Sequence, residues 1–447
     1  MRKKSARYLT VTLLEGIEKQ HRYANLSLNH LLQSEDLSEV DRHLVTRLVY
    51  GTIQWQLRLD YNWKAFVKHP EDLPLWIKVL LRVSLYQMFF LDKVPAHAIL
   101  NEANEIAKTR DHGRYTKLVN AVLRHVQRNG EQDYQLIQDD EQRLSITHSM
   151  PLWLTHRLVA QYGFERCESM LEQVNQPPRA AARVNTEKIS REDLLAELGD
   201  ELPDLKPSQL SPFGITAEGG NFAQQTQFQQ GELTVQDESS MLVAPSLQLK
   251  PGYQVLDACS APGGKTTHIA SYLEAHSGGR VIALDIHQNK LNLVADNAQR
   301  MGVADRVVTK ALDARLVDKE FKDDYFDRIL VDAPCSGLGL MRRKPEIRYA
   351  KQEQEIANLP KIQLDILSAM ASKIKVNGLV VYSTCTILSA ENQDVVEKFL
   401  QLHPNFELIK VQAAEEINWT GDQKLFQLLM DDYQTDGFFI ACLKRIN

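Results

Sequence analysis

Apolar residues recur at helical spacing through the first 128 residues of the chain. One series runs from Leu44 to Leu57, a second from Ile77 to Met88, and a third from Ile99 to Ala107. Their i, i+3, i+4 recurrence is typical of helices with one buried face. Prolines at 70, 74 and 95 separate the series. The pattern predicts an all-α N-terminal domain.

The pattern changes after the acidic, polar run from Asn129 to Gln142, which predicts a linker or exposed loop. The helical domain is therefore expected to span residues 1–142. Residues 143–235 contain a helical stretch from Pro151 to Gly163, a strand candidate at Arg179–Asn185, and a helix capped by Ser190. This mixture predicts a small α+β connecting region.

From residue 236 to 447 short apolar runs alternate with helical stretches. The predicted strands are Val255–Asp257, Arg280–Asp285, Arg306–Asp313, Phe326–Asp332, Gly378–Thr384 and Phe438–Leu443. The predicted helices are His287–Arg300, Leu359–Val376 and Glu391–Leu402. This alternation predicts a doubly wound α/β domain with a Rossmann-like sheet, and ligands are expected at the carboxyl ends of its strands.

Composition agrees with a multidomain globular protein, since 43% of the 447 residues are hydrophobic and 25% are charged. The net charge of −6 is unevenly distributed. Residues 1–128 carry 20 Lys and Arg against 13 Asp and Glu, whereas the remainder carries 32 against 45. A basic front on an acidic body fits a phosphate-binding module, but helix faces that are basic and merely solvated fit equally well.

The sequence predicts a cytoplasmic protein without a membrane or metal partner. No apolar stretch follows Met1, so no secretory signal is expected. The apolar segment Leu75–Leu91 carries Lys78 and Arg82 and is too short to span a bilayer, which predicts a buried helix. Five cysteines without CxxC spacing indicate free thiols in a reducing compartment.

The stretch from Tyr253 to Thr266 predicts a strand, a glycine-bearing turn and the start of a helix. Gly263 and Gly264 allow a ligand to approach the backbone closely. The end of this turn also resembles a phosphate-binding P-loop, which would make the protein a nucleotidase. That alternative requires a glycine where Cys259 stands, and Pro262 stiffens the loop.

Four predicted strands end in aspartate: Asp257, Asp285, Asp313 and Asp332. A single such aspartate is more often a helix cap, but four in one sheet indicate an acidic ligand pocket. Carboxylates suit a ligand with hydroxyls, an amine and a positive centre better than a triphosphate. S-adenosylmethionine has these features, and the aspartate at the end of the second strand is placed for ribose hydroxyls.

Two cysteines follow neighbouring strands. Cys335 comes just after the fourth predicted strand and Cys385 just after the fifth, so both are expected at one edge of the sheet. A thiolate that adds to C6 of cytosine makes C5 nucleophilic enough to take a methyl group, and a second group nearby must manage the proton. Two cysteines can divide these roles.

These motifs together resemble the RNA (cytosine-5) methyltransferases of the RsmB or Sun type. The resemblance rests on Asp257-Ala-Cys-Ser-Ala-Pro-Gly-Gly-Lys-Thr266, Asp332-Ala-Pro-Cys-Ser-Gly337, Ser383-Thr-Cys-Thr386 and Leu233-Thr-Val-Gln-Asp-Glu-Ser-Ser240. The front resembles the NusB-like RNA-binding domain in Leu48-Val-Tyr-Gly51, His97-Ala-Ile-Leu-Asn-Glu102 and Leu118-Val-Asn-Ala-Val-Leu-Arg124. The likeness spans nearly the whole chain and implies 16S ribosomal RNA as substrate.

The resemblance also implies roles for individual residues. Cys385 would attack C6, and Cys335 would assist release of the methylated product. S-adenosylmethionine would be bound by Cys259, Ser260, Ala261, Pro262, Gly263, Gly264, Lys265, Asp285, Asp313 and Asp332. Asp285 would hold the ribose, Asp313 would lie near the adenine, and Asp332 would reach the cytosine as well. Lys290 and Ser260 are mild departures from the family pattern.

A basic cluster in the loop after Cys335 is the candidate for phosphate contacts near the target base. It consists of Arg342, Arg343, Lys344 and Arg348, and an exposed basic loop without a ligand is the alternative. A base reaches the thiols most easily from a loop or single strand of RNA. We expect a monomer. The remaining alternative is a non-catalytic RNA-binding protein, which would tolerate loss of both thiols.

Overall fold

The computed structural model describes residues 5–413 except 21–23, together with 417, 419 and 421–447. The chain forms two compact units. The first contains the residues up to Asn175 together with Lys344–Ala350, and the second contains Gln176–Arg343 and Lys351–Asn447. A short segment from the loop after Cys335 therefore belongs to the N-terminal unit.

The first unit is built from helices, as the hydrophobic spacing predicts. They are α1 (Ala6–Gln20), α2 (Ala24–Ser34), α3 (Glu39–Gln54), α4 (Gln56–Lys64), α5 (Leu75–Phe90), α6 (Ala96–Thr109), α7 (Thr116–Asn129), α8 (Asp140–His148), α9 (Leu152–Tyr162), α10 (Phe164–Val174) and α17 (Ile347–Ala350). Helix α5 is buried along most of its length, which confirms the prediction for its apolar sequence. Its Arg82 is neutralised by Asp60, with N–O distances of 2.7 and 2.8 Å.

One part of the predicted linker between residues 129 and 142 is helical. Asp139 caps helix α8 by accepting a hydrogen bond from the backbone N–H of Gln142. Acidic residues favour the first turn of a helix because of the partial positive charge there. The acidic run that suggested a loop is therefore, in its second half, a helix start.

The second unit begins with a small antiparallel sheet. Its strands are β1 (Ala180–Val184), β2 (Lys206–Pro207), β3 (Gly214–Ala217) and β4 (Leu233–Val235), in the order β2-β3-β1-β4. Helices α11 (Arg191–Leu198) and α12 (Thr226–Gln230) accompany it. Ser190 caps α11 through the N–H of Asp193, as predicted. The sheet and α11 confirm an α+β connecting region.

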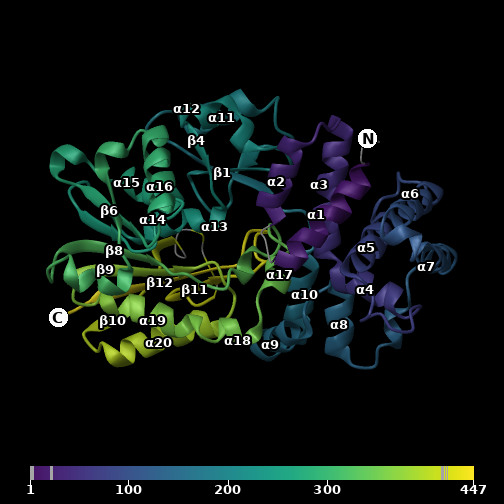
Figure 1. Cartoon of the computed structure of the whole chain (residues 1–447). Helices are drawn as coiled ribbons and strands as arrows, with labels where there is room; N and C mark the ends of the chain where they lie inside the picture. The colour runs from purple at the N-terminus through teal and green to yellow at the C-terminus, as the bar shows by residue number, and fades with distance from the viewer. Residues whose placement is uncertain (1–4, 21–23, 414–416, 418, 420) are drawn as a thin grey trace. The chain divides into compact units, whose positions relative to one another are not determined.

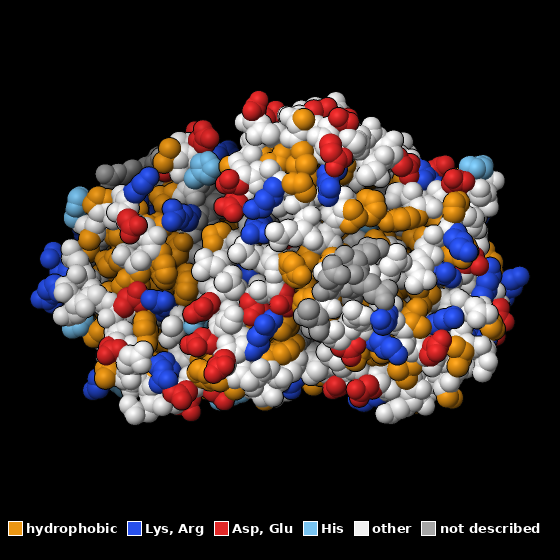
Figure 2. Space-filling model, turned by 180° about the vertical axis from the view of Figure 1, so that it is seen from behind, with side chains coloured by type: hydrophobic (Ala, Val, Ile, Leu, Met, Phe, Trp, Pro, Cys, Tyr) orange, Lys and Arg blue, Asp and Glu red, His pale blue; other side chains and the backbone are white. Residues whose placement is uncertain are grey.

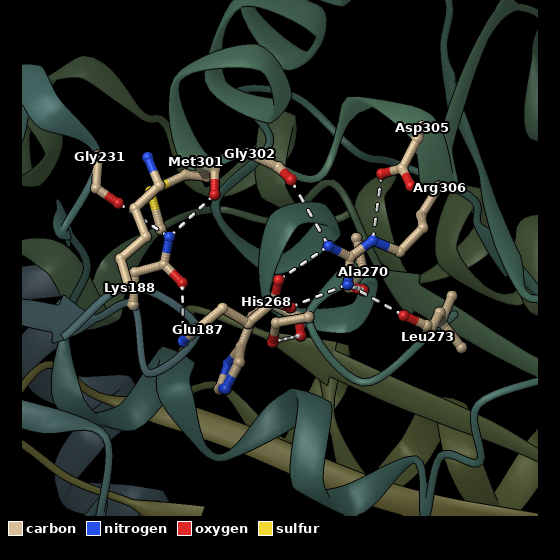
Figure 3. Close-up of polar contacts among 12 residues, drawn as sticks. Glu187, Lys188, Gly231, His268, Ala270, Leu273, Met301, Gly302, Asp305 and Arg306 are labelled. Carbon is tan, nitrogen blue, oxygen red and sulfur yellow. Dashed lines mark hydrogen bonds and ion pairs between the residues drawn. The ribbon is translucent and has the colours of Figure 1, made fainter. Parts of the chain in front are cut away.

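This connecting region is tied to the larger sheet by polar contacts that Figure 3 shows. Glu187 accepts two hydrogen bonds of 2.8 Å from the Arg306 guanidinium, which also donates to the carbonyls of Ala270 and Leu273. The bond to Glu187 raises the pKa of Arg306. Lys188 donates to the carbonyl of Arg300. These contacts hold the connecting region against the domain that carries the glycine loop.

The larger sheet has five parallel strands extended by antiparallel ones. The strands are β5 (Gln254–Asp257), β6 (Arg280–Asp285), β7 (Val307–Ala311), β8 (Phe326–Asp332), β9 (Ile374–Thr384), β10 (Phe406–Ile409), β11 (Leu425–Leu428) and β12 (Phe438–Arg445). Their order is β10-β12-β9-β8-β5-β6-β7, and β11 pairs with β12. The direction of strand order reverses at β5, which places a ligand crevice at its carboxyl end.

Helices cover both faces of this sheet (Figure 1). Helices α15 (Gly264–Ala270) and α16 (Gln288–Met301) pack on one face, and α19 (Leu359–Ala369) and α20 (Gln393–Leu402) on the other. Short helices α13 (Glu238–Met241), α14 (Val243–Ser246) and α18 (Glu353–Ile356) complete the unit. The three layers confirm the Rossmann-like prediction.

One predicted boundary in this unit is wrong. The helix expected from Leu359 to Val376 ends at Ala369, and β9 already begins at Ile374. The residues from Ile374 onward include Val376, Leu379 and Val380, whose branched side chains suit a strand. An apolar run that passes directly from helix to strand gives no change in hydrophobicity at the boundary.

The surface carries mixed charge. On the face shown in Figure 2, Lys and Arg side chains alternate with Asp and Glu instead of gathering in one basic patch. Among the residues that the structure describes, none lies in a helix long and apolar enough to cross a membrane.

Candidate active site

The two thiols meet at the carboxyl end of β8 and β9. These strands are parallel neighbours, and Asp332 pairs with Ser383 in the register. The segments that follow them start at the same edge of the sheet. They bring the Sγ atoms of Cys335 and Cys385 to 3.3 Å from each other, while both residues remain free cysteines. The expectation that the two thiols share one edge of the sheet is confirmed.

The pair has an asymmetric electrostatic environment. The hydrogen bond with Cys385 raises the pKa of the Cys335 thiol well above its ordinary value, and burial and the negative charge of Glu391 act in the same direction. Cys335 therefore retains its proton. A retained proton can be donated to the neighbouring sulfur, so the geometry suits a thiol beside a thiolate.

A lysine and an aspartate lie beside the thiols. Lys265 Nζ is 2.7 Å from Asp332 Oδ2, and the Ser383 hydroxyl donates to Asp332 Oδ1 at 2.8 Å. Burial acts to lower the pKa of Lys265, but the charge of Asp332, with a smaller contribution from Cys385, raises it. Lys265 thus stays cationic beside Asp332.

The glycine loop joins β5 to α15, as predicted. Gly263 has φ +104°, and a Cβ there would meet the backbone of Val294 at 3.0 Å, so only glycine fits without strain. A Cβ on Gly264 would meet no atom within 4 Å, so its backbone faces open space. The loop therefore has a packed side at Gly263 and an approachable side at Gly264.

Asp257 ends β5 beneath this loop and is fully buried. Its Oδ2 accepts from the Thr266 hydroxyl at 2.7 Å, whereas Oδ1 has no partner among the described residues. Burial raises the pKa of Asp257 to about 7. A buried polar atom without a partner is costly unless a ligand or water satisfies it.

The other loop residues take mostly structural positions. The amide and hydroxyl of Ser260 both donate to the carbonyl of Leu284, at 2.8 and 2.9 Å. The carbonyl of Pro262 accepts from Asn297. Cys259 and Ala261 pack against apolar clusters, and burial raises the pKa of the Cys259 thiol well above its ordinary value. Ser260 thus shapes the loop from the strand side.

Asp285 and Asp313 lie at the ends of successive strand segments. Asp285 ends β6, and its Oδ1 accepts from the backbone N–H of His287. Asp313 follows β7 by two residues and is paired with Arg315, whose hydrogen bond lowers the pKa of Asp313. Asp257, Asp285 and Asp332 therefore end strands as predicted, whereas Asp313 lies in the turn beyond its strand.

The basic cluster predicted to hold phosphates is largely internal. Arg342 is buried and donates to the carbonyls of Gln434 and Met430. Arg343 binds both Asp237 and Asp436, with N–O distances of 2.6 and 3.0 Å. These guanidinium groups are committed to structural acceptors, so the phosphate prediction is wrong for both.

The same correction applies to Arg348, which is fully buried in the helical unit. Its guanidinium donates to the Asn175 side chain at 2.9 Å and to the carbonyl of Val174 at 3.3 Å. Burial lowers the pKa of Arg348. Lys344 is the exposed member of the predicted cluster. A run of basic residues in sequence does not reveal which of them have buried acceptors.

Two residues near the site were missed by sequence reasoning. Arg183 of β1 is buried and donates to the Thr267 hydroxyl and the Gly264 carbonyl, at 3.0 and 3.3 Å, which ties the connecting region to α15. Burial lowers its pKa to about 9. Glu391 is fully buried behind the thiols. In the sequence, the only signal for Glu391 is its position six residues after Cys385.

Metal-ligating side chains are sparse. Among the described residues, the group within reach of a common ion is His69, Glu71 and Asp72, all exposed. Exposed acidic groups are common without a metal, so this group carries no functional argument. The chemistry of the site rests on sulfur, carboxylate and ammonium groups.

A reversed parallel sheet, a glycine turn after its first strand and acidic strand ends define a Rossmann-like methyltransferase domain. Family models agree: residues 244–444 match the 16S rRNA methyltransferase RsmB/F model, residues 4–128 the NusB family, and residues 150–221 the ferredoxin-like domain of RsmF/B-like methyltransferases. The chain belongs to the RsmB/F family of S-adenosylmethionine-dependent rRNA methyltransferases.

Relatives match over the full length. A Bacillus subtilis protein named as a probable ribosomal RNA small subunit methyltransferase B is 40% identical, with all of both chains covered. The ribosomal RNA small subunit methyltransferase B of Pseudomonas putida is 34% identical over 94% of each chain. The crystal structure of PH0851 has a TM-score of 0.81 at 24% identity and covers 99% of both chains, which supports the fold. The nucleotidase alternative is thereby set aside.

Proposed function

We propose that this protein methylates C5 of a cytosine in 16S ribosomal RNA through a covalent bond between Cys385 and C6 of the base. The observation that carries this proposal is the pair of thiols 3.3 Å apart at the ends of β8 and β9. A methyltransferase acting on a more nucleophilic nitrogen or oxygen has no need of such a pair. The names of the relatives support small-subunit ribosomal RNA as the substrate.

The residues around the glycine loop fit S-adenosylmethionine. The open space at Gly264 leaves room for a polar ligand at this turn. In the proposed site Asp285 holds the ribose hydroxyls, Asp313 lies near the adenine, and the loop from Cys259 to Lys265 surrounds the remainder. When bound, S-adenosylmethionine supplies an electrophilic methyl group on a sulfonium.

Cys385 begins the proposed reaction as a thiolate. Its sulfur lone pair forms a bond to C6, and the electrons of the C5–C6 double bond move into the ring and make C5 nucleophilic. C5 would then bond to the methyl group, and the electron pair of the broken bond to the methyl group would remain on the donor sulfur. Asp332, held between Lys265 and Ser383, would contact the ring.

Release restores the aromatic ring. The C5 proton passes to water, the electrons of the C5–H bond form the C5–C6 double bond, and the electrons of the C6–S bond return to Cys385 Sγ. The sulfur that leaves becomes a thiolate, and the thiol proton of Cys335 stabilises it by a hydrogen bond. The raised pKa of Cys335 keeps that proton in place.

The decisive experiment compares Cys385→Ala and Cys335→Ala on an unmodified 16S rRNA transcript with S-adenosylmethionine. Cys385→Ala, which removes the nucleophile, should lower the rate of methyl transfer by at least about 1,000-fold without unfolding the protein. Loss of the release group should instead accumulate a protein–RNA adduct that survives a denaturing gel. Cys167→Ala serves as control, because Cys167 is buried in α10 of the helical unit.

Each rival makes a different prediction in this experiment. Methyl transfer by Cys385→Ala at the wild-type rate would eliminate the covalent route. Absence of any slow-migrating adduct with Cys335→Ala would remove the release role of Cys335. A non-catalytic RNA-binding protein would bind the transcript and transfer no methyl group even without substitutions. Bisulfite sequencing of ribosomal RNA from cells with and without the protein then identifies the cytosine.

A further inference from the structure

A buried carboxylate lies behind the two thiols and contacts the residue that follows each of them. Glu391 ends the short 3-10 helix Ser389–Glu391, just before α20, and is fully buried. Ser336, which follows Cys335, donates its backbone N–H to Glu391 Oε2 at 2.8 Å and its hydroxyl to Oε1 at 2.6 Å. Thr386, which follows Cys385, donates its hydroxyl to Oε1 at 3.1 Å.

The remaining contacts close the network. Gln363 of α19 donates to Glu391 Oε2 at 3.0 Å and to the carbonyl of Pro334 at 3.0 Å. The hydroxyls of Ser336 and Thr386 are 2.7 Å apart. Oε2 thus accepts from the Ser336 N–H and from Gln363, whereas Oε1 and the two hydroxyls form three contacts that share two hydroxyl protons. Among the described residues, no cation contacts the carboxylate. A buried charge held only by neutral donors requires that all of them stay in place.

The next residue, Asn392, holds the other side of the nucleophile. Its Oδ1 accepts from the Thr384 hydroxyl at 2.6 Å, and its Nδ2 donates to the carbonyl of Thr386 at 3.1 Å. Cys385 is therefore flanked by two residues that Asn392 binds. The hydroxyl of Tyr382 donates to the backbone carbonyl of Glu391 at 2.6 Å, which fixes this segment to β9.

We propose that Glu391 is a positioning residue that sets the distance between the two thiols by binding Ser336 and Thr386 with one carboxylate. It touches neither base nor cofactor and acts through the two loops. The inference rests on the proposed function, because it assigns a role to the thiol spacing. A thiol displaced by about 1 Å loses its hydrogen bond to the leaving sulfur, and misplacement of this size costs on the order of 100-fold in rate.

The variants separate geometry from charge. Glu391→Ala removes all four acceptor contacts and frees both loops. In Glu391→Gln, the amide oxygen can accept from Ser336 and Gln363, and the amide NH₂ can donate to the two hydroxyls, so the spacing is kept without the charge. Glu238→Ala is the matched control, since Glu238 is also buried in this unit and is bound by Ser208 rather than by the thiol loops.

The assay is adduct formation on the unmodified 16S rRNA transcript with S-adenosylmethionine, followed on a denaturing gel alongside turnover. Glu391→Ala is expected to lower kcat about 100-fold with KM nearly unchanged and to accumulate the same adduct as Cys335→Ala. Glu391→Gln is expected to turn over without accumulation. Glu238→Ala is expected to lose thermal stability but to form no lasting adduct.

A second readout concerns the proton of Cys335. Because the negative charge of Glu391 contributes to the raised pKa of that thiol, Glu391→Gln should lower the pH at which Cys335 becomes reactive toward iodoacetamide. Mass spectrometry of the alkylated peptide measures this directly. A merely structural role for Glu391 would leave the alkylation profile of the folded Gln variant unchanged.

A folded Glu391→Ala protein that turns over like wild type, or that is inactive without adduct while Cys335→Ala accumulates it, overturns the inference. If Glu391→Ala does not fold, Ser336→Ala tests the same link, because it removes the shortest contact and should accumulate adduct to a smaller extent. Failure of Cys335→Ala to form adduct would instead remove the release role of Cys335, on which the inference rests, while Cys385→Ala tests the proposed covalent route separately.

Discussion

Replacement of Arg343 by methionine tests whether the basic loop after Cys335 is structural. Arg343 lies between the partly buried carboxylate of Asp237 and the buried carboxylate of Asp436, and it also donates to the carbonyl of Arg179 at 2.8 Å. Removing one partner of a buried ion pair costs about 3–5 kcal/mol. Because the Arg343 side chain is 29% exposed, the expected loss of stability lies at the lower end of this range, at about 3 kcal/mol. For a unit of this size that corresponds to a fall in Tm of about 6–12 °C.

The loss of stability in Arg343→Met should be larger at high pH than at low pH. Burial raises the pKa of Asp436 to about 7 even with the guanidinium present, whereas Arg343 outweighs burial and lowers the pKa of Asp237. An acid with a raised pKa contributes stability below its unfolded pKa and loses that contribution as the pH rises through the folded value. Without Arg343 this effect grows, so the variant should be destabilised more at pH 8 than at pH 5.5.

Differential scanning calorimetry at both pH values measures the effect, and filter binding of 16S rRNA provides the contrast. Lys344→Met is the matched control, since Lys344 is the adjacent exposed cation, and its Tm should equal that of wild type. Adding Asp436→Asn to Arg343→Met should recover part of the lost Tm, because one unpaired carboxylate is gone. Weaker RNA binding by Arg343→Met at an unchanged Tm would refute the structural role and restore the phosphate contact.

Three further substitutions test other parts of the molecule. Asp285→Ala should weaken S-adenosylmethionine binding about tenfold or more with RNA binding unchanged, as measured by calorimetry, since hydrogen bonds to a charged group contribute about 1.5–3 kcal/mol; the opposite order would remove the ribose assignment. Arg348→Met should lower the stability of the helical unit by about 1–3 kcal/mol, because its buried neutral acceptors lose their donor; an unchanged Tm contradicts this. Arg306→Met should cost about 1–2 kcal/mol in the second unit, and Arg280→Met, at the exposed start of β6, should not.

The main sheet could be predicted because its strands are buried on both faces and appear as short apolar runs that end in polar residues. Val255–Asp257 and Phe326–Asp332 have this form, and they become β5 and β8. Strands β10 and β11 were missed because both are short and half-exposed, with polar residues inside them. Weak periodicity in four residues cannot be distinguished from a loop.

The candidate site was predictable only where the chemistry follows directly from strand ends. Cys335 and Cys385 follow strands that pair with each other, so their approach is a consequence of sheet order. Glu391 escaped notice because its partners, Ser336 and Gln363, come from distant parts of the sequence. No local pattern of residues shows that a glutamate between a thiol and a helix will be buried among four donors.

The loop after Cys335 shows how buried acceptors change the meaning of a basic sequence. Ser336 is bound by Glu391, Arg343 is bound by two aspartates of the second unit, and Arg348 is buried within the first unit. Each of these contacts holds its residue to acceptors within its own unit. Arginines used in this way are bound to internal acceptors and do not add positive charge to the surface. Neutralising Lys344 should therefore change RNA binding without changing adduct release, whereas neutralising the buried arginines should change stability first.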